Sequence, residues 1–125
     1  MNNKINNYLT LNNLQGNKVD INYNKDQYDF NSIPKNIVYC YITCDDYTKI
    51  ISILDDLLYK LLNGAILIFD KWYYNIHIRG KNERDIVTAW MNDYNCELIN
   101  FNIHNSLLEE SFIFRKKPIT NYWSD

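Results

Sequence analysis

Two short polar segments of the sequence carry residue types that could do chemistry, and each follows an apolar run of strand length. These segments are Thr43-Cys44-Asp45-Asp46 and Asp70-Lys71-Trp72. If the two runs form adjacent parallel strands, about 4.8 Å apart, Asp45 and Asp70 lie on one rim within reach of one ligand. Carboxylates at such a rim serve as general bases, metal ligands or helix caps. A structural role is equally open, in which Asp45 or Asp46 only caps a helix and Asp70 only ends a strand.

The apolar patterns around these segments predict a strand–helix–strand unit. Residues 37–42 and 65–69 are continuous apolar runs, which are typical of strands buried on both faces of a parallel sheet. Apolar residues repeat every three or four positions over 47–62, which predicts a helix with Asp45-Asp46 at its N-cap and Asn63-Gly64 at its end. We therefore expect the strands at about 37–43 and 65–70 to be parallel neighbours.

The second half of the chain predicts one more helix and a closing hairpin. Residues 72–79 read as a loop, and 83–94 as a helix with one apolar face. The segments 97–103 and 110–115 then alternate as strands, which predicts an antiparallel hairpin with 104–109 as its turn.

The first 36 residues are polar and turn-rich, with two strand-like pieces at Tyr8–Leu11 and Lys18–Tyr23. The strand at 37–43 is apolar on both faces, so we expect this N-terminal region, or a second copy of the chain, to cover its edge. The predicted organisation is a single domain over 1–125. It comprises a polar extension at 1–36, an α/β core at 37–118 and a tail at 119–125.

Composition excludes several classes of protein. The 125 residues are 46% apolar with a net charge of −2, no apolar run reaches the roughly 20 residues of a membrane helix, and the start lacks a signal peptide. A cytoplasmic protein that binds neither membranes nor nucleic acid is expected. The odd set Cys40, Cys44 and Cys96 predicts reduced, buried thiols, and His77 and His104 lack a second ligand nearby for zinc.

Several segments together match the pattern of one enzyme family. Tyr41–Tyr47 reads as a strand that ends in an acidic pair. Asn63–Trp72 reads as a turn and a strand that ends in Phe-Asp before an aromatic residue. Weaker matches lie upstream and downstream, at Asp29–Pro34, Gly80, Glu83, Arg84 and Ala89-Trp90. Over residues 29–115 the chain resembles the late half of the macrocin O-methyltransferase-like enzymes, which depend on S-adenosylmethionine.

The resemblance implies a fold and a set of roles. The fold would be a truncated Rossmann-like class I methyltransferase sheet, in the order strand, helix, strand, helix and antiparallel hairpin, with a short N-terminal strand region. The reaction would be O-methylation of a sugar or another small hydroxyl compound. Asp45 would be the catalytic base, Asp70 and Lys71 would orient the substrate, and Trp72 and Tyr73 would form an apolar wall.

Departures from the family pattern change what is expected of cofactors. The acidic metal positions of metal-dependent members correspond to Thr43, Asp45, Asp70 and Lys71, so two carboxylates are replaced and we expect no divalent metal. Only 36 residues precede Ile37, and the three glycines are too far apart for a Gly-rich cofactor turn. The isolated chain is therefore not expected to bind S-adenosylmethionine tightly.

Two functions remain open. The chain is a partial or degenerate O-methyltransferase whose cofactor half belongs to another chain, or it is a non-enzymatic methyltransferase-like interaction module. In the second case an exposed sheet edge would pair with a partner chain or with a second copy.

Overall fold

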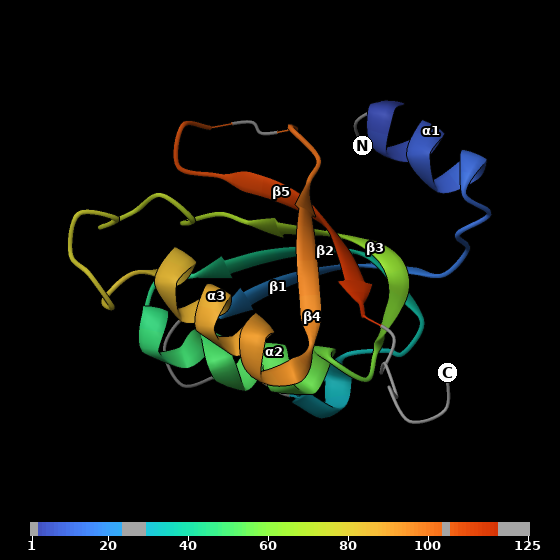
Figure 1. The fold of residues 1–125 in the computed structure, drawn as a ribbon. Helices are drawn as coiled ribbons and strands as arrows, with labels where there is room; N and C mark the ends of the chain where they lie inside the picture. The colour runs from blue at the N-terminus through green and yellow to red at the C-terminus, as the bar shows by residue number, and fades with distance from the viewer. Residues whose placement is uncertain (1–2, 24–29, 104–105, 118–125) are drawn as a thin grey trace, which may run out of the picture.

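A five-stranded mixed sheet forms the centre of the protein in the computed structural model, which describes residues 3–23, 30–103 and 106–117 (Figure 1). Its strands lie in the order β1-β2-β3-β5-β4. The first three are parallel, and β5 is antiparallel to both β3 and β4. The strand bounds are Asn17–Tyr23 for β1, Ile37–Cys44 for β2, Leu61–Phe69 for β3, Cys96–Asn100 for β4 and Glu110–Lys116 for β5. The predicted parallel pair and the predicted antiparallel hairpin are both confirmed.

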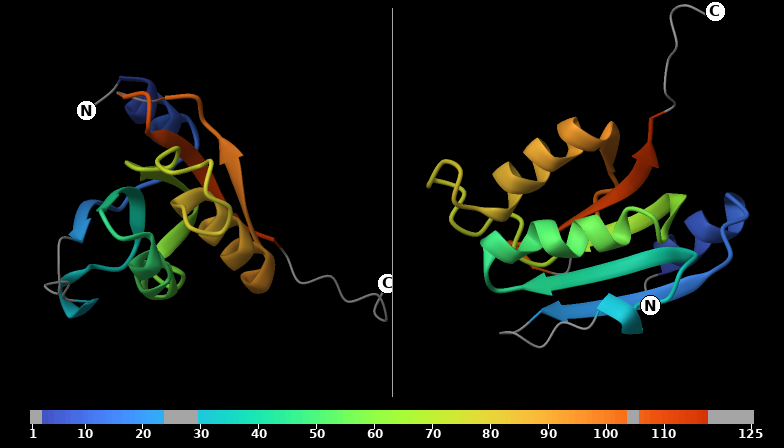
Figure 2. Two further views of the ribbon diagram at one scale, coloured as in Figure 1. Left: turned by 90° about the vertical axis from the view of Figure 1, so that its left-hand side faces the viewer. Right: turned by 90° about the horizontal axis from the view of Figure 1, so that it is seen from below.

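Helices cover both faces of the sheet. The helices α2 (Ile50–Leu57) and α3 (Glu83–Tyr94) lie side by side on one face, and α1 (Asn3–Leu11) lies apart from them, on the opposite face (Figures 1 and 2). The indole Nε1 of Trp90 donates to Asp55 Oδ1 at 2.9 Å and so joins α3 to α2. Two short 3-10 helices complete the elements, η1 at Phe30–Ser32 and η2 at Tyr47–Lys49.

The strand β2 is packed on both sides. Cys40 and Ile42 belong to the larger apolar cluster, which also contains the buried side of α2 and Trp90 of α3. Val38 belongs to a second cluster, formed with Ile66 and Ile68 of β3 and with Ile5 and Leu9 of α1. A strand apolar on both faces is stable only between two such layers, because each buried Ile or Leu side chain contributes about 1.5–3 kcal/mol.

The N-terminal region packs on the sheet, and its structure corrects one prediction and confirms another. Residues 8–11 lie in α1 and not in a strand, because Ile5 and Leu9, one helical turn apart, pack together on the second cluster. The other piece is a strand as predicted, since β1 pairs in parallel with β2 from Asn17 to Tyr23. The edge of β2 is thus covered by the N-terminal 36 residues, which is one of the two predicted arrangements.

The crossover helix is shorter than its apolar pattern predicted. The pattern predicted a helix over 47–62, but α2 ends at Leu57 and β3 already begins at Leu61. Leu61 pairs with Ile37 of β2, and Asn63-Gly64 lies inside β3 and does not end the helix. The apolar side chains at 61 and 62 satisfy a helix and a strand equally well, and pairing with β2 decides between them.

Local hydrogen bonds show which residues cap the helices. Asp46, not Asp45, caps η2: its Oδ1 accepts from the backbone N–H of Thr48 at 3.0 Å and from the hydroxyl of Thr48 at 2.6 Å. The predicted helix at 83–94 is confirmed, with Asn82 as its N-cap and Asn95 in the left-handed conformation at its end.

Other predictions are settled in part. The three cysteines are free and buried, as predicted. Among the described residues, no helix is long and apolar enough to cross a membrane. Part of the predicted hairpin turn, 104–105, and the predicted tail at 119–125 lie outside the described residues.

Gly16 tests the docking of β1 against β2. A Cβ atom at this position would lie 2.1 Å from the backbone oxygen of Asn36, which accepts the N–H of Asn17 at 2.8 Å. We expect Gly16→Ala to lower the free energy of unfolding by about 1–3 kcal/mol, because the strand must shift to relieve the overlap. Urea denaturation followed by circular dichroism measures the change.

Gly80→Ala is the control for this prediction. No atom lies within 4 Å of a Cβ at Gly80, whose φ is +75°, so only backbone strain of about 1 kcal/mol is expected there. If Gly16→Ala is as stable as the wild type, the described approach of the two segments is wrong.

Candidate functional site

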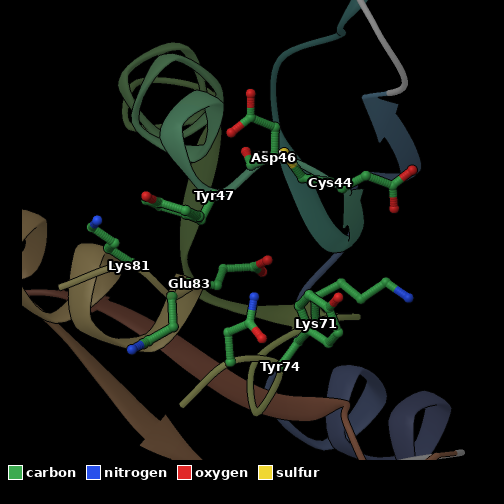
Figure 3. Close-up of a pocket in the computed structure, with 10 residues that line it drawn as sticks. Cys44, Asp46, Tyr47, Lys71, Tyr74, Lys81 and Glu83 are labelled. Carbon is green, nitrogen blue, oxygen red and sulfur yellow. Dashed lines mark hydrogen bonds between the residues drawn. The ribbon is translucent and has the colours of Figure 1, made fainter. Parts of the chain in front are cut away.

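A cavity of about 530 Å³ opens where β2 and β3 end, at the carboxyl ends of the parallel strands. Ligands of open α/β sheets collect at this edge. Acidic, basic, amide and aromatic side chains line it together (Figure 3). The lining residues are Cys44, Asp45, Asp46, Tyr47, Lys71, Tyr74, Asn75, Lys81, Asn82 and Glu83.

Two of the five predicted site residues line this cavity, Asp45 and Lys71. Asp70 stands next to Lys71 but is not in the lining, and its side chain bonds instead to Tyr41, which packs against the second apolar cluster. The hydroxyl of Tyr41 donates to Asp70 Oδ1 at 3.1 Å, and Lys71 Nζ lies 3.8 Å from Asp70 Oδ2. The structure therefore places Asp45 and Asp70 at one rim without directing both into one pocket.

The other two predicted residues, Trp72 and Tyr73, lie outside the lining. Trp72 is only 7% exposed and packs in the core, with its ring 5.1 Å from Phe69 and 4.7 Å from Phe112. The hydroxyl of Tyr73 donates to Glu110 Oε2 at 2.8 Å. The aromatic surface of the cavity comes from other residues, Tyr47 and Tyr74.

Glu83 is the most unusual residue of the cavity. It is 2% exposed, and its Oε1 has no hydrogen-bond partner in the described part of the chain. Burial, with a smaller contribution from Asp70, raises the pKa of Glu83 to about 8, and Lys71 partly opposes the shift. Figure 3 shows the carboxyl group of Glu83 directed into the cavity, between Tyr47 and Lys71. A buried carboxyl group with one unpartnered oxygen, facing a cavity, is suited to contact a ligand.

Glu83 is named in the sequence only as part of a weaker family match, with no role. As the first residue of α3, an acidic residue reads as an ordinary partner of the helix dipole, exposed to water. The glycine and amide pattern before it, Gly80 and Asn82, marks a helix start but says nothing of burial. Only the packing of α3 against the ends of β2 and β3 encloses this side chain.

Cys44 lines the cavity but is not suited to nucleophilic chemistry. Its Sγ donates to the backbone oxygen of Asp46 at 3.1 Å, and burial raises the pKa of the thiol to about 11. A thiol with this pKa stays protonated at neutral pH, and the thiolate is the reactive form.

A second polar cluster lies on the opposite face of the sheet. The hydroxyl of Tyr41 contacts Glu109 Oε1 at 2.5 Å as well as Asp70, and Glu109 is 2% exposed. Burial and the hydrogen bond to Glu109 raise the pKa of Tyr41, so the phenol remains protonated. This cluster ties the end of β3 to the start of β5.

The described side chains contain no group of three or more His, Cys, Asp or Glu residues that could hold a metal ion. Comparisons with protein-family models, with curated proteins and with solved structures find no match to this chain. The geometry of the cavity and the residues that line it are therefore the basis for inferring a function.

The raised pKa of Glu83 predicts how stability changes with pH. The folded state holds a proton on Glu83 up to about pH 8, whereas the unfolded chain releases it near the ordinary glutamate pKa of 4.5. Between these values the folded state binds more protons, so this group makes the free energy of unfolding fall as pH rises, with the full loss above pH 8.

We expect Glu83→Gln to remove this dependence. The variant should be more stable than the wild type at pH 9 by a few kcal/mol, on the order of 2–4, and similar to it near pH 5. Denaturant titrations of both proteins at pH 5, 7 and 9 measure the difference. Parallel pH profiles for the two proteins would contradict the burial of an uncompensated carboxyl group.

Proposed function

We propose that the chain is the acceptor-binding part of an O-methyltransferase-like protein, and that the cavity binds a sugar or another small hydroxyl compound. The observation that carries the proposal is the cavity at the carboxyl ends of β2 and β3, with Asp45 at its mouth and Glu83 enclosed within it. A hydroxyl group that attacks an electrophilic carbon needs a base to take its proton, and the exposed carboxylate of Asp45 fills this role.

The order of the strands supports the finer interpretation of the fold. Three parallel strands followed by an antiparallel hairpin agree with a truncated class I methyltransferase sheet. On this interpretation, β2 and β3 are the strands whose ends face the acceptor.

S-adenosylmethionine does not fit the residues of this chain. The three glycines lie apart: Gly16 precedes β1, Gly64 lies within β3 and Gly80 precedes α3. A Gly-rich turn that brings the backbone close to the cofactor cannot be built from them. The methyl donor would have to be held by another chain, and no step is assigned here to the cofactor.

The alternative function is an interaction module that pairs with another chain through an exposed sheet edge. The structure gives this alternative less support. The edge of β2 is covered, and the strand now at the edge, β1, carries the exposed charged residues Lys18 and Asp20. Charged side chains on an edge strand oppose pairing with another sheet.

Binding of a sugar tests the acceptor site directly. We expect D-glucose, used as a probe, to shift the NMR signals of the lining residues. Tyr74→Ala should weaken binding by about five- to tenfold, because an aromatic ring packs against the sugar.

Tyr59→Ala is the matched control, since Tyr59 is 81% exposed and lies outside the cavity lining. Shifts that spread evenly over the surface would refute the site. Tight binding of S-adenosylmethionine by the purified chain, measured by calorimetry, would refute the assignment of the cofactor to another chain.

Two aspartate substitutions distinguish a loss of catalysis from a loss of stability. In an assay with labelled S-adenosylmethionine and a chain that supplies the cofactor half, Asp45→Asn should abolish methyl transfer because it removes the proton acceptor. Asp93→Asn, the same change at an exposed position of α3 outside the cavity lining, should leave transfer in place. Equal activity of the two variants would exclude Asp45 as the base.

A further inference from the structure

The charged groups around the enclosed carboxyl of Glu83 are balanced. Asp45 and Asp46 line the cavity from the end of β2, and Asp70 acts on Glu83 from outside the lining. Against these three carboxylates stand Lys71 and Lys81 in the lining and Arg84 next to it in sequence. With Glu83 protonated these groups carry no net charge, so the choice of ligand depends on which of them reach the Glu83 carboxyl group.

Two of the three cations are already matched with carboxylates. Lys71 Nζ lies 3.8 Å from Asp70 Oδ2, and Arg84 Nε lies 3.6 Å from Asp85 Oδ1. The ammonium ends of Lys71 and Lys81 lie on either side of the cavity and are directed away from the Glu83 carboxyl group (Figure 3). The protein thus builds a buried acceptor, Oε1 of Glu83, and provides it with no donor among the described residues.

We infer that the missing donor is an ammonium group of the ligand, so that the cavity selects an acceptor carrying both a hydroxyl and a protonated primary amine, such as an amino sugar. The inference deepens the proposed function and rests on it for the hydroxyl compound. The amine would donate to Glu83 Oε1, and the rings of Tyr47 and Tyr74, which line the same cavity, offer faces that attract a cation. Asp45, at the mouth, is then left to act on the hydroxyl.

The inference predicts a proton linkage. At pH 7 the free protein holds a proton on Glu83, whose pKa is raised to about 8 by burial and by Asp70. An ammonium group stabilises the carboxylate, so binding releases close to one proton per site and strengthens as the pH rises toward 8. The other titratable groups in the lining are Cys44, Asp45, Asp46, Tyr47, Lys71, Tyr74 and Lys81, and Asp70 acts on Glu83 from outside the lining. A substitution of Glu83 is therefore needed to show that this residue releases the proton when the ligand binds.

The test compares three sugars that differ at one position: D-glucose, 6-amino-6-deoxy-D-glucose and D-glucose 6-phosphate. Each is titrated calorimetrically into the full chain at pH 7 and pH 8.5, in buffers with different ionisation enthalpies. We expect the amino sugar to bind at least tenfold more tightly than glucose at pH 8.5, and to release close to one proton at pH 7. Glu83→Gln should abolish both the preference and the release. Glu97→Gln, the same change on β4 outside the cavity, should alter neither.

Other outcomes overturn the inference in distinguishable ways. Equal affinity for glucose and the amino sugar would leave the acceptor site standing and refute the role of the amine. Preference for the phosphate, with proton uptake, would show that protonated Glu83 and the lysines recognise an anion. Failure of all three sugars to bind would refute the amine and the proposed sugar acceptor together. A preference that survives Glu83→Gln would assign the amine to another carboxylate and refute the inference.

Discussion

The burial of β2 and β3 on both faces is the constraint on which the rest of the structure depends. Two adjacent parallel strands rich in Ile, Val and Leu need an apolar layer above and below, and a neighbour at each edge. The crossover provides α2 for one face, and α3 extends that layer. The N-terminal residues supply the second apolar layer and the neighbouring strand: α1 packs on the second face, and β1 pairs along the edge of β2.

The same arrangement creates the cavity and determines which side chains face it. Both central strands end at one rim, and α3 begins beside that rim, so its first residue, Glu83, is enclosed. Alternation along β3 directs Asp70 to the opposite face, where Tyr41 bonds to it. A carboxyl group enclosed without a donor costs stability, and the packed core around it offsets that cost. A carboxyl group held in such an unfavourable environment is typical of a binding site.

The sequence predicted a helix or strand correctly where all local signals agreed on one kind of element. The runs at 37–42 and 65–69 are too apolar for an exposed strand and too short for most helices, and the helix at 83–94 has one apolar face. The local signals failed where a pattern suited two structures. Residues 8–11 became helical because Leu9 packs with Ile5, and Leu61 joined β3 because it pairs with Ile37. Both outcomes depend on partners far away in the sequence.

The sequence by itself determined the class of fold, the parallel pair with its crossover helix, the closing hairpin, the reduced thiols and the rim that carries Asp45 and Lys71. These features follow from periodicity, caps and the direction of parallel strands, all of which are local or nearly so. Only the tertiary structure decided that Trp72 belongs to the core, that Asp70 points away from the cavity and that Glu83 points into it. Burial and electrostatic environment are properties of the surrounding atoms, and those atoms come from segments that the sequence keeps apart.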